Sequence, residues 1–325
     1  MRLRRSQLTG PGWHRRRRGR GFSYVDDDGA VLDDPEVRQR IDDLVIPPAW
    51  RDVWICPHPN GHIQAVGVDA AGRKQYLYHE RWRSDRDEEK HERVLALAPA
   101  LPDFRARVAA ALAARGLGRE RVLAAALHLL DHGVFRVGGE SYAEDNGTHG
   151  VATLLREHVV VRGDAVEFCY PAKGGIEFCR TITDPALARV VKSLARSRSD
   201  CDRLLVYRTG GQWCAVRSDE LNERFKELVG AEFSVKDLRT WHATVKAATA
   251  FALAERPGSQ RGRRRVEAAV MRDVAEELGN TPAVARKSYV DPKVVRAYEG
   301  GRTIRVRDLA DRAAVESAVV RLLNS

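Results

Sequence analysis

The sequence predicts an α+β protein with a small β-rich N-terminal domain and a larger, mainly α-helical domain that contains a three-stranded β-sheet. Its 325 residues are enough for two domains. Residues 22–80 consist of short apolar runs separated by turn signals, whereas most of the later chain has apolar residues at helical spacing. We therefore expect a flexible basic arm over residues 1–21, a β-rich domain over 22–85 and a mainly helical domain over 86–325.

The elements of the first domain are read from its turns. The Asp-Gly pair in GFSYVDDDGAVL separates two apolar stretches and predicts a hairpin. The segment PEVRQRIDDLVI predicts a short helix that stops before Pro47. Two strands are expected on either side of Asn60 and Gly61, and a third over 75–78.

The second domain is expected to begin with two core helices, in DFRARVAAALAARG and RERVLAAALHLLDHG, each closed by a glycine. Three strand-like runs follow in HVVVRGDAVEFCYPAKGGIEFCRTI, which has glycine turns at Gly163 and at Gly174. The remaining chain predicts helices over 185–197, 218–229, 235–255, 264–278 and 313–323. The helix over 235–255 opens with Ser234 and Asp237 at the spacing of a capping box.

The composition indicates a basic, intracellular protein. Lys and Arg number 55 against 45 acidic residues, a formal charge of +10, which is compatible with a polyanionic partner. No stretch approaches the roughly 18–20 apolar residues that a membrane span requires, and the basic N-terminus lacks the apolar run of a signal peptide. The five cysteines are odd in number and form no CxxC, so we expect reduced thiols rather than a disulfide framework or a zinc site.

Several catalytic motifs are absent from the sequence. It has no GxxxxGK[ST] phosphate loop, no HExxH zinc motif and no GxSxG nucleophile motif. We therefore expect chemistry by side chains alone, with no cofactor, no ATP and no required divalent metal.

The remaining candidates are a spread set of polar side chains. Arg136 follows the second core helix, Lys173 lies at a hairpin tip and Arg239 lies near the start of a capped helix, whereas Asn280 and Tyr289 share one later segment. Taken singly, each has an ordinary explanation, such as a surface ion pair for Arg136, a solvated turn for Lys173 or a core aromatic for Tyr289.

Together these residues suit the attack of a tyrosine on a DNA phosphodiester. Two arginines and an amide donor can surround the non-bridging oxygens of a five-coordinate phosphorus, because arginine is always charged and donates in a fork. A lysine on a movable hairpin can protonate the leaving 5′-oxygen. Covalent capture on tyrosine conserves the energy of the phosphodiester, so the strand can be rejoined without ATP.

Four motifs in order along the chain resemble those of type IB DNA topoisomerases of the small bacterial and poxvirus group. They are FRVGGESYAEDNGTHGVATL, YPAKGGIEF, SVKDLRTWHATVKAA and GNTPAVARKSYVDPKVV, and the upstream segment GRKQYLYHERW fits as well. The resemblance covers nearly the whole chain from about residue 22, and it implies the fold of the topoisomerase IB and tyrosine recombinase enzymes.

The resemblance also implies catalytic roles. Arg136 and Arg239 match the two arginines that contact the scissile phosphate, and Lys173 matches the general acid. Tyr289 matches the nucleophile that forms a 3′-phosphotyrosyl link. Asn280 stands where many members, including the poxvirus enzymes, have histidine, which keeps a donor but removes a group that can carry charge.

Further expectations concern DNA. The resemblance implies a clamp around double-stranded, preferably supercoiled, DNA, in which the N-terminal domain covers one face of the duplex. It also suggests that the protein acts as a monomer in the cytoplasm, associated with the nucleoid. The residues expected to contact DNA are Gln75, Tyr76, Tyr78, Tyr142, Thr148 and Lys236.

Two other functions account for part of these features. A tyrosine site-specific recombinase shares the phosphotyrosyl chemistry, but it typically has HxxR where this chain has Lys236 three residues before Arg239, and its N-terminal domain is usually helical. A DNA-binding protein without enzymatic activity explains the charge but not the combination of Lys173 and Tyr289.

Overall fold

The computed structural model describes residues 2–325, except for the side chain of Tyr142, so the DNA contact predicted at Tyr142 lies outside what is described. The chain divides into two compact units, Met1–Lys90 and His91–Ser325, here named the N-terminal and C-terminal units. The division falls within helix α2 (Glu80–Leu97), whose first half also contains the boundary expected between residues 85 and 86.

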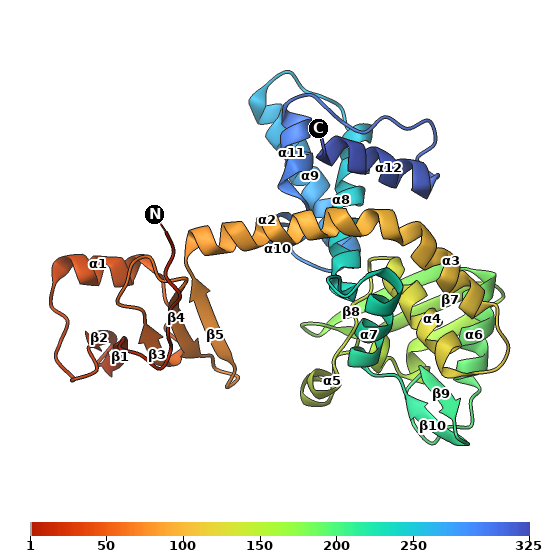
Figure 1. Ribbon diagram of the computed structural model, residues 1–325, viewed down its shortest axis with the longest axis horizontal. Coiled ribbons are helices and arrows are strands. Elements are labelled where there is room, and N and C mark those ends of the chain that lie inside the picture. The colour runs from red at the N-terminus through yellow and green to blue at the C-terminus, as the bar shows by residue number, and fades with distance from the viewer. Residues whose placement is uncertain (1) are drawn as a thin grey trace. The chain divides into compact units, whose positions relative to one another are not determined.

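The N-terminal unit is built on a five-stranded antiparallel sheet in the order β2-β1-β3-β4-β5, drawn in red to orange in Figure 1. This confirms the predicted β-rich character. The strands and the one helix before α2 are β1 (Trp13–Arg18), β2 (Gly21–Val25), α1 (Pro35–Asp43), β3 (Arg51–Ile55), β4 (Ile63–Val68) and β5 (Lys74–Tyr78). A small apolar core lies against the sheet, with Ile41 of α1 packed among strand residues such as Ile55 and Ala65.

The prediction of a flexible arm over residues 1–21 was wrong for residues 13–18. These form β1, which pairs with both β2 and β3. The guanidinium of Arg15 lies 4.2 Å from the centroid of the Phe22 ring and donates to three backbone carbonyls between residues 46 and 50. An arginine-rich segment can therefore form a strand. The backbone carbonyls and the aromatic ring that contact Arg15 compensate the cost of partly burying its charge.

The C-terminal unit holds a large helical core together with a three-stranded antiparallel sheet in the order β6-β7-β8 and a separate hairpin, β9-β10. This confirms the predicted helical unit and its three-stranded sheet, drawn in green in Figure 1. The strands are β6 (Val159–Arg162), β7 (Ala165–Ala172), β8 (Ile176–Thr183), β9 (Val206–Thr209) and β10 (Gln212–Ala215). The helices after α2 are α3 (Leu101–Leu112), α4 (Arg119–Asp131), α5 (Glu140–Asn146), α6 (Pro185–Ala195), α7 (Ser218–Val229), α8 (Val235–Leu253), α9 (Gln260–Leu278), α10 (Pro282–Ser288), α11 (Pro292–Glu299) and α12 (Arg312–Leu323). Single 3₁₀ turns lie at Ala98–Ala100, Val151–Thr153 and Arg156–His158.

Two helices of this unit position the site. Helix α4 is buried along most of its length, because its residues 122–127 are all apolar and all inaccessible, so it fixes the chain that follows it. Helix α8 begins where the sequence predicts, since the backbone N–H and the hydroxyl of Ser234 both donate to Asp237 at 2.9 Å. A second partner, Arg93, holds the same carboxylate at 3.0 Å.

The prediction that all cysteines are reduced was wrong for one pair. Cys169 of β7 and Cys179 of β8 face each other in the strand register and are joined by a disulfide. The register brings them together although they are ten residues apart in the chain, which is why no short cysteine motif signals the pair. The free cysteines are Cys56, Cys201 and Cys214.

None of the helices in the described part of the chain is both long and apolar enough to cross a membrane.

Candidate active site

The loop after α4 carries Arg136 into the site. Phe135 is buried and anchors the loop, and the backbone carbonyl of Arg136 accepts from the N–H of Val151 at 2.8 Å. The two segments of this loop that contain Gly138 and Gly150 are in close backbone contact. A Cβ on Gly150 would lie 2.4 Å from the Gly138 nitrogen, and Gly138 itself has φ +81°, so both positions require glycine.

Arg136 is held against the end of α9. Its Nη2 donates to the side-chain oxygen of Asn280 at 2.8 Å and to the carbonyl of Gly279 at 3.0 Å. Gly279 ends α9 in the left-handed conformation, with φ +57°. Because the amide oxygen of Asn280 is used by Arg136, its Nδ2 is left buried without a hydrogen-bond partner among the described residues.

Arg239 lies in the first turns of α8 and is almost fully buried. Its Nη1 donates to the carbonyl of Val134 at 2.6 Å, and its Nη2 donates to the carbonyl of Leu278. The Nε of Arg239 is buried and has no partner in the described structure. Burial and the nearby Arg136 lower the pKa of Arg239 to about 10, which still leaves it charged at neutral pH.

Tyr289 follows α10 and faces Arg239, whose guanidinium carbon lies 5.4 Å from the centre of the tyrosine ring. Thr244 of α8 fixes the backbone here: its hydroxyl donates to the carbonyl of Tyr289 at 3.3 Å and accepts from the N–H of Asp291 at 3.1 Å. Burial alone would raise the pKa of Tyr289. The charge and hydrogen bond of Arg239 outweigh it, with smaller help from Arg136 and Lys236, and leave the pKa below its ordinary value.

The structure thus brings four of the five predicted catalytic residues together. A phenol with a lowered pKa lies beside Arg239 and close to Arg136, and two buried donors, Arg239 Nε and Asn280 Nδ2, have no acceptor among the described residues. Unsatisfied buried donors are rare in proteins, and such donors suit an anionic oxygen. The arrangement fits a phosphate group in contact with Tyr289.

Lys173 is the exception. It lies exposed in the turn between β7 and β8, where Gly174 and Gly175 have φ of +86° and +72°. No described contact joins Lys173 to Arg136, Arg239, Asn280 or Tyr289. The hairpin is nevertheless linked to the Arg136 loop, because the N–H of His149 donates to the carbonyl of Pro171 at 2.8 Å.

The predicted DNA contacts are distributed over both units. In the N-terminal unit, Tyr76 and Tyr78 of β5 are exposed and stack with ring centres 6.0 Å apart, whereas Gln75 donates to Asp69 at 2.9 Å. In the C-terminal unit, Lys236 is exposed one turn before Arg239.

Thr148, another predicted contact, is buried in the loop after α5. Its hydroxyl has no hydrogen-bond partner in the described part of the chain.

Sequence reasoning missed Tyr170 of β7. Burial raises the pKa of Tyr170 against the opposing effect of Arg136 and Arg239, which places a neutral hydroxyl near both arginines. One feature of the sequence could have indicated it: side chains alternate between the two faces of a strand, and this alternation places Tyr170 on the buried face of β7.

A buried ionic network beneath the site was also missed. Asp131, at the end of α4, accepts from Arg105 of α3 at 2.8 Å and from Arg312 of α12 at 2.9 Å, and both arginines also bind Glu316. Burial would raise the pKa of Asp131, but His242 and the two arginines lower it strongly. The network fixes the C-terminus of α4, from which the Arg136 loop departs.

Two family models match this chain. One is described as the catalytic core of eukaryotic DNA topoisomerase I and matches residues 79–306, more than half of the chain. The other is described as the N-terminal domain of bacterial DNA topoisomerase IB and matches residues 21–69. The fold and the matched core define the class: the protein is an enzyme, a type I DNA topoisomerase.

A curated relative narrows the class. DNA topoisomerase 1B of Acanthamoeba polyphaga mimivirus is 29% identical over 269 residues, which is 80% of this chain and 80% of that protein. The chain belongs to the type IB DNA topoisomerase family.

Proposed function

We propose that the enzyme relaxes supercoiled double-stranded DNA by cutting and rejoining one strand through a 3′-phosphotyrosyl intermediate on Tyr289. The observation that carries this proposal is the geometry at Tyr289: the guanidinium carbon of Arg239 lies 5.4 Å from the centre of its ring, and Arg239 Nε and Asn280 Nδ2 are buried donors without acceptors. A phenolate beside two guanidinium groups is the form of tyrosine that attacks phosphorus.

The steps follow from the side chains. Tyr289 Oη attacks the phosphorus as it loses its proton, and the bond to the 5′-oxygen breaks. Arg136, Arg239 Nε and Asn280 Nδ2 stabilise the negative charge on the non-bridging oxygens. Lys173 gives its proton to the leaving 5′-oxygen after the β7–β8 hairpin brings it to the DNA. Rejoining reverses these steps, with the 5′-hydroxyl returning its proton to Lys173.

The proposal includes the conditions of the reaction. The covalent bond to Tyr289 stores the energy of the cut phosphodiester, so neither ATP nor a divalent metal is required. The enzyme acts as a monomer on DNA in the cytoplasm, at the nucleoid.

The test is relaxation of a supercoiled plasmid in EDTA without ATP, combined with trapping of the covalent adduct on a nicked suicide duplex and mapping of the modified residue. We expect relaxation, with the adduct on Tyr289. Tyr289→Phe should lose both the adduct and relaxation while it still binds duplex DNA, because only the hydroxyl is removed. An adduct on another residue, or relaxation by Tyr289→Phe near the wild-type rate, would refute the assignment.

The role of Lys173 is tested separately. We expect Lys173→Ala to cleave an ordinary phosphodiester about 10²–10⁴ times more slowly, the usual contribution of a general acid. A 5′-bridging phosphorothiolate should restore cleavage, because its sulfur leaves without protonation. Slow cleavage of both substrates would argue against Lys173 as the acid.

A further inference from the structure

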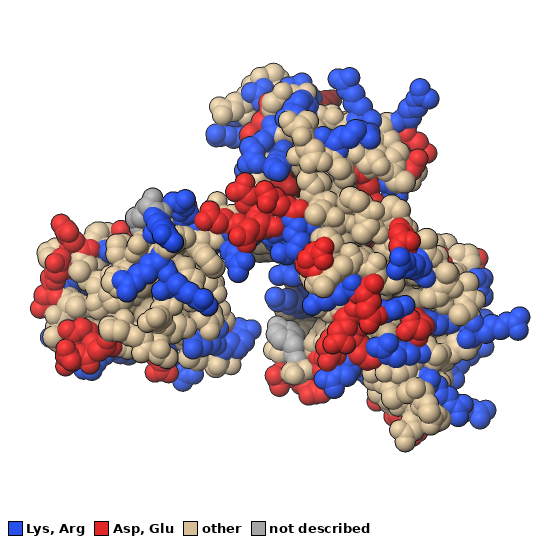
Figure 2. Space-filling model, in the orientation of Figure 1, with Lys and Arg blue, Asp and Glu red and all other residues tan. Residues whose placement is uncertain are grey.

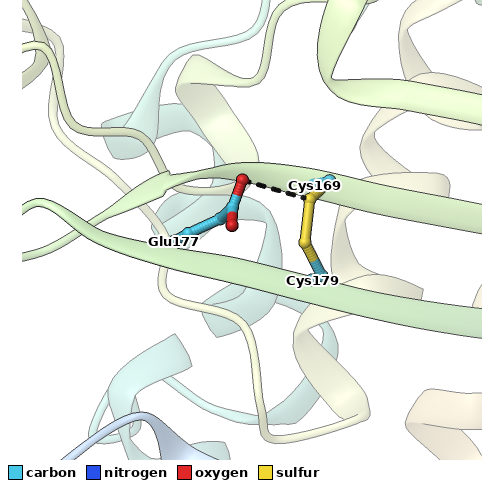
Figure 3. Close-up of side chains that lie close together, drawn as sticks. All are labelled: Cys169, Glu177 and Cys179. Atoms are coloured by element: carbon cyan, nitrogen blue, oxygen red, sulfur yellow. Dashed lines mark hydrogen bonds between the residues drawn. A yellow bond between two sulfur atoms is a disulfide. The ribbon is translucent and has the colours of Figure 1, made fainter.

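The hairpin that carries Lys173 also carries a cluster of sulfur and carboxylate groups. Cys169 of β7 faces Cys179 of β8 across the strand pair, and Glu177 lies two residues before Cys179 (Figure 3). The Glu177 carboxylate is 3.8 Å from the sulfur of Cys169. Cys179 and Glu177 are exposed and Cys169 is partly exposed, so reagents in solution reach the pair.

The register makes this pair a natural cross-link. The two Cα atoms are 4.2 Å apart, just under the usual range of about 4.4–6.8 Å for a disulfide, so the two sulfurs are within bonding reach without backbone movement. Three residue pairs separate the cysteines from the turn that holds Lys173: Tyr170 with Phe178, then residues 171 with 177 and 172 with 176. A bond between the sulfurs therefore closes a short ring around the Lys173 turn.

Lys173 lies apart from the other catalytic groups in a hairpin that is cross-linked. In the structure, which has the disulfide, Lys173 is exposed and makes no described contact with Arg136, Arg239, Asn280 or Tyr289. Proton delivery requires the hairpin to bend or twist towards the DNA, and a covalent bond between its strands restricts both motions.

We propose that Cys169 and Cys179 are a reversible oxidation site, and that the disulfide slows strand cleavage by restraining the hairpin of Lys173. The proposal rests on the proposed role of Lys173 as general acid. The oxidant is a small-molecule disulfide of the glutathione class, and the reductant is a dithiol.

The chemistry balances as an exchange. Cys179 is the attacking group, because it is more exposed than Cys169 and an external disulfide reaches it first. Its thiolate bonds to one sulfur of the external disulfide and releases the other half as a thiolate. The sulfur of Cys169 then attacks Cys179, releases the second half as a thiolate and gives its proton to solvent. Two protein thiols are oxidised and one external disulfide is reduced to two thiols.

The experiment measures single-turnover cleavage of a suicide duplex by the full-length enzyme, after treatment with dithiothreitol or with glutathione disulfide. We expect the oxidised enzyme to cleave an ordinary phosphodiester about tenfold more slowly, part of the contribution of a general acid, and dithiothreitol to restore the rate. Cys169→Ser and Cys179→Ser should not respond to oxidation. The matched control is Cys201→Ser with Cys214→Ser, which removes two free thiols and should respond like the wild type.

A second substrate separates this proposal from the proposed function. With a 5′-bridging phosphorothiolate, which needs no acid, the reduced and oxidised enzymes should cleave at equal rates. Equal rates on the ordinary phosphodiester, with Lys173→Ala still slow, would overturn the redox site and leave Lys173 as the acid. If the Lys173→Ala enzyme cleaved as fast as the wild type, the role of Lys173 as general acid would instead be refuted.

The same cluster has the ligand types of a soft metal site, and the test includes that outcome. If equimolar Zn²⁺ protects both thiols of the reduced enzyme from alkylation and changes cleavage, whereas the disulfide reagent does not, the cluster binds metal and the redox proposal is wrong.

Discussion

Asn280 has one amide atom in use and one that is free to bind. Its oxygen accepts from Arg136 at 2.8 Å, whereas its Nδ2 is buried and has no hydrogen-bond partner among the described residues. A neutral histidine at this position could also accept from Arg136 at one nitrogen and donate from the other, but a charged histidine donates at both nitrogens and cannot accept. The asparagine therefore keeps both an acceptor for Arg136 and a donor at every pH.

We expect Asn280→Ala to slow cleavage about 10²-fold, because the loss of one preorganised donor to a transition-state oxygen typically costs 10²–10³. Asn280→His should retain most of the rate at pH above about 6.5, where a neutral histidine can still accept from Arg136 and donate from its other nitrogen, and lose part of it below, where the charged ring cannot accept from Arg136. Single-turnover cleavage across pH measures both. If the Asn280→Ala enzyme cleaved as fast as the wild type, Asn280 would not be a catalytic residue.

The lowered pKa of Tyr289 predicts a pH profile. Cleavage should rise with pH as the phenol ionises and level off above its pKa, with a midpoint below the ordinary value of about 10 for tyrosine. Arg239 is the main group that lowers this pKa, so Arg239→Gln should move the midpoint to higher pH as well as reduce the rate. Lys236→Gln is the control, since Lys236 is exposed and contributes least, and its midpoint should move little. An unmoved midpoint in Arg239→Gln would contradict this account of the site.

At the scale of elements, the sequence predicted most of the helices and strands but not how their ends meet. Helices α7 and α8 begin where expected because their first turns hold strong capping side chains, and the turns around β6–β8 carry glycine at positive φ. The charged helix α2 was not predicted, and β1 was predicted to be part of a flexible arm. Both segments are rich in charged residues, so neither shows the periodic apolar pattern from which helices and strands are predicted. The contact of Arg136 with Asn280, 144 residues apart, arises only from the packing of the α4 and α9 ends.

The network at the end of α4 makes a prediction about stability. Asp131→Asn should lower the free energy of unfolding at pH 7 by roughly 3–5 kcal/mol, because Arg105 and Arg312 then lose a buried partner. The folded-state pKa of Asp131 is depressed, so its contribution is present above its unfolded pKa of about 4 and is lost as the pH falls below it. Denaturant unfolding at pH 7 and near pH 3 should show the difference between mutant and wild type shrinking in acid.

The control for this prediction is Asp103→Asn on α3. Asp103 pairs with Arg107 at 2.6 Å, but both side chains are exposed, and such surface pairs contribute little. If Asp103→Asn and Asp131→Asn lowered the free energy of unfolding equally, the stabilising role of the buried network would be wrong.

At the scale of the whole molecule, both units carry positive side chains. On the face that Figure 2 shows, Lys and Arg side chains occur over both units with acidic groups between them, and the net charge is +10. In the proposed reaction, side chains of both units can contact phosphates, and the affinity for DNA then depends on released counterions.

We expect the Kd for a duplex to rise steeply with salt, by about 10³–10⁵ between 50 and 200 mM if the enzyme contacts 6–10 phosphates. Arg17 and Arg18 of β1 are exposed, so replacing both with Ala should reduce the slope of log Kd against log salt without unfolding the sheet. Titration by fluorescence anisotropy at several salt concentrations measures the slope. An unchanged slope would show that this end of β1 does not contact phosphate.

The two hydrogen bonds of the Thr244 hydroxyl connect the backbone around Tyr289 to a long helix. This single hydroxyl ties the peptide on both sides of Tyr289–Val290 to the long helix α8, through the carbonyl of Tyr289 and the N–H of Asp291. In the proposed reaction, the cut end is bonded to the tyrosine oxygen while one strand turns about the other, so any pull on that end reaches the backbone of Tyr289. Because Thr244 ties this backbone to a helix of 19 residues, we expect it to keep the broken end within bonding reach of its partner.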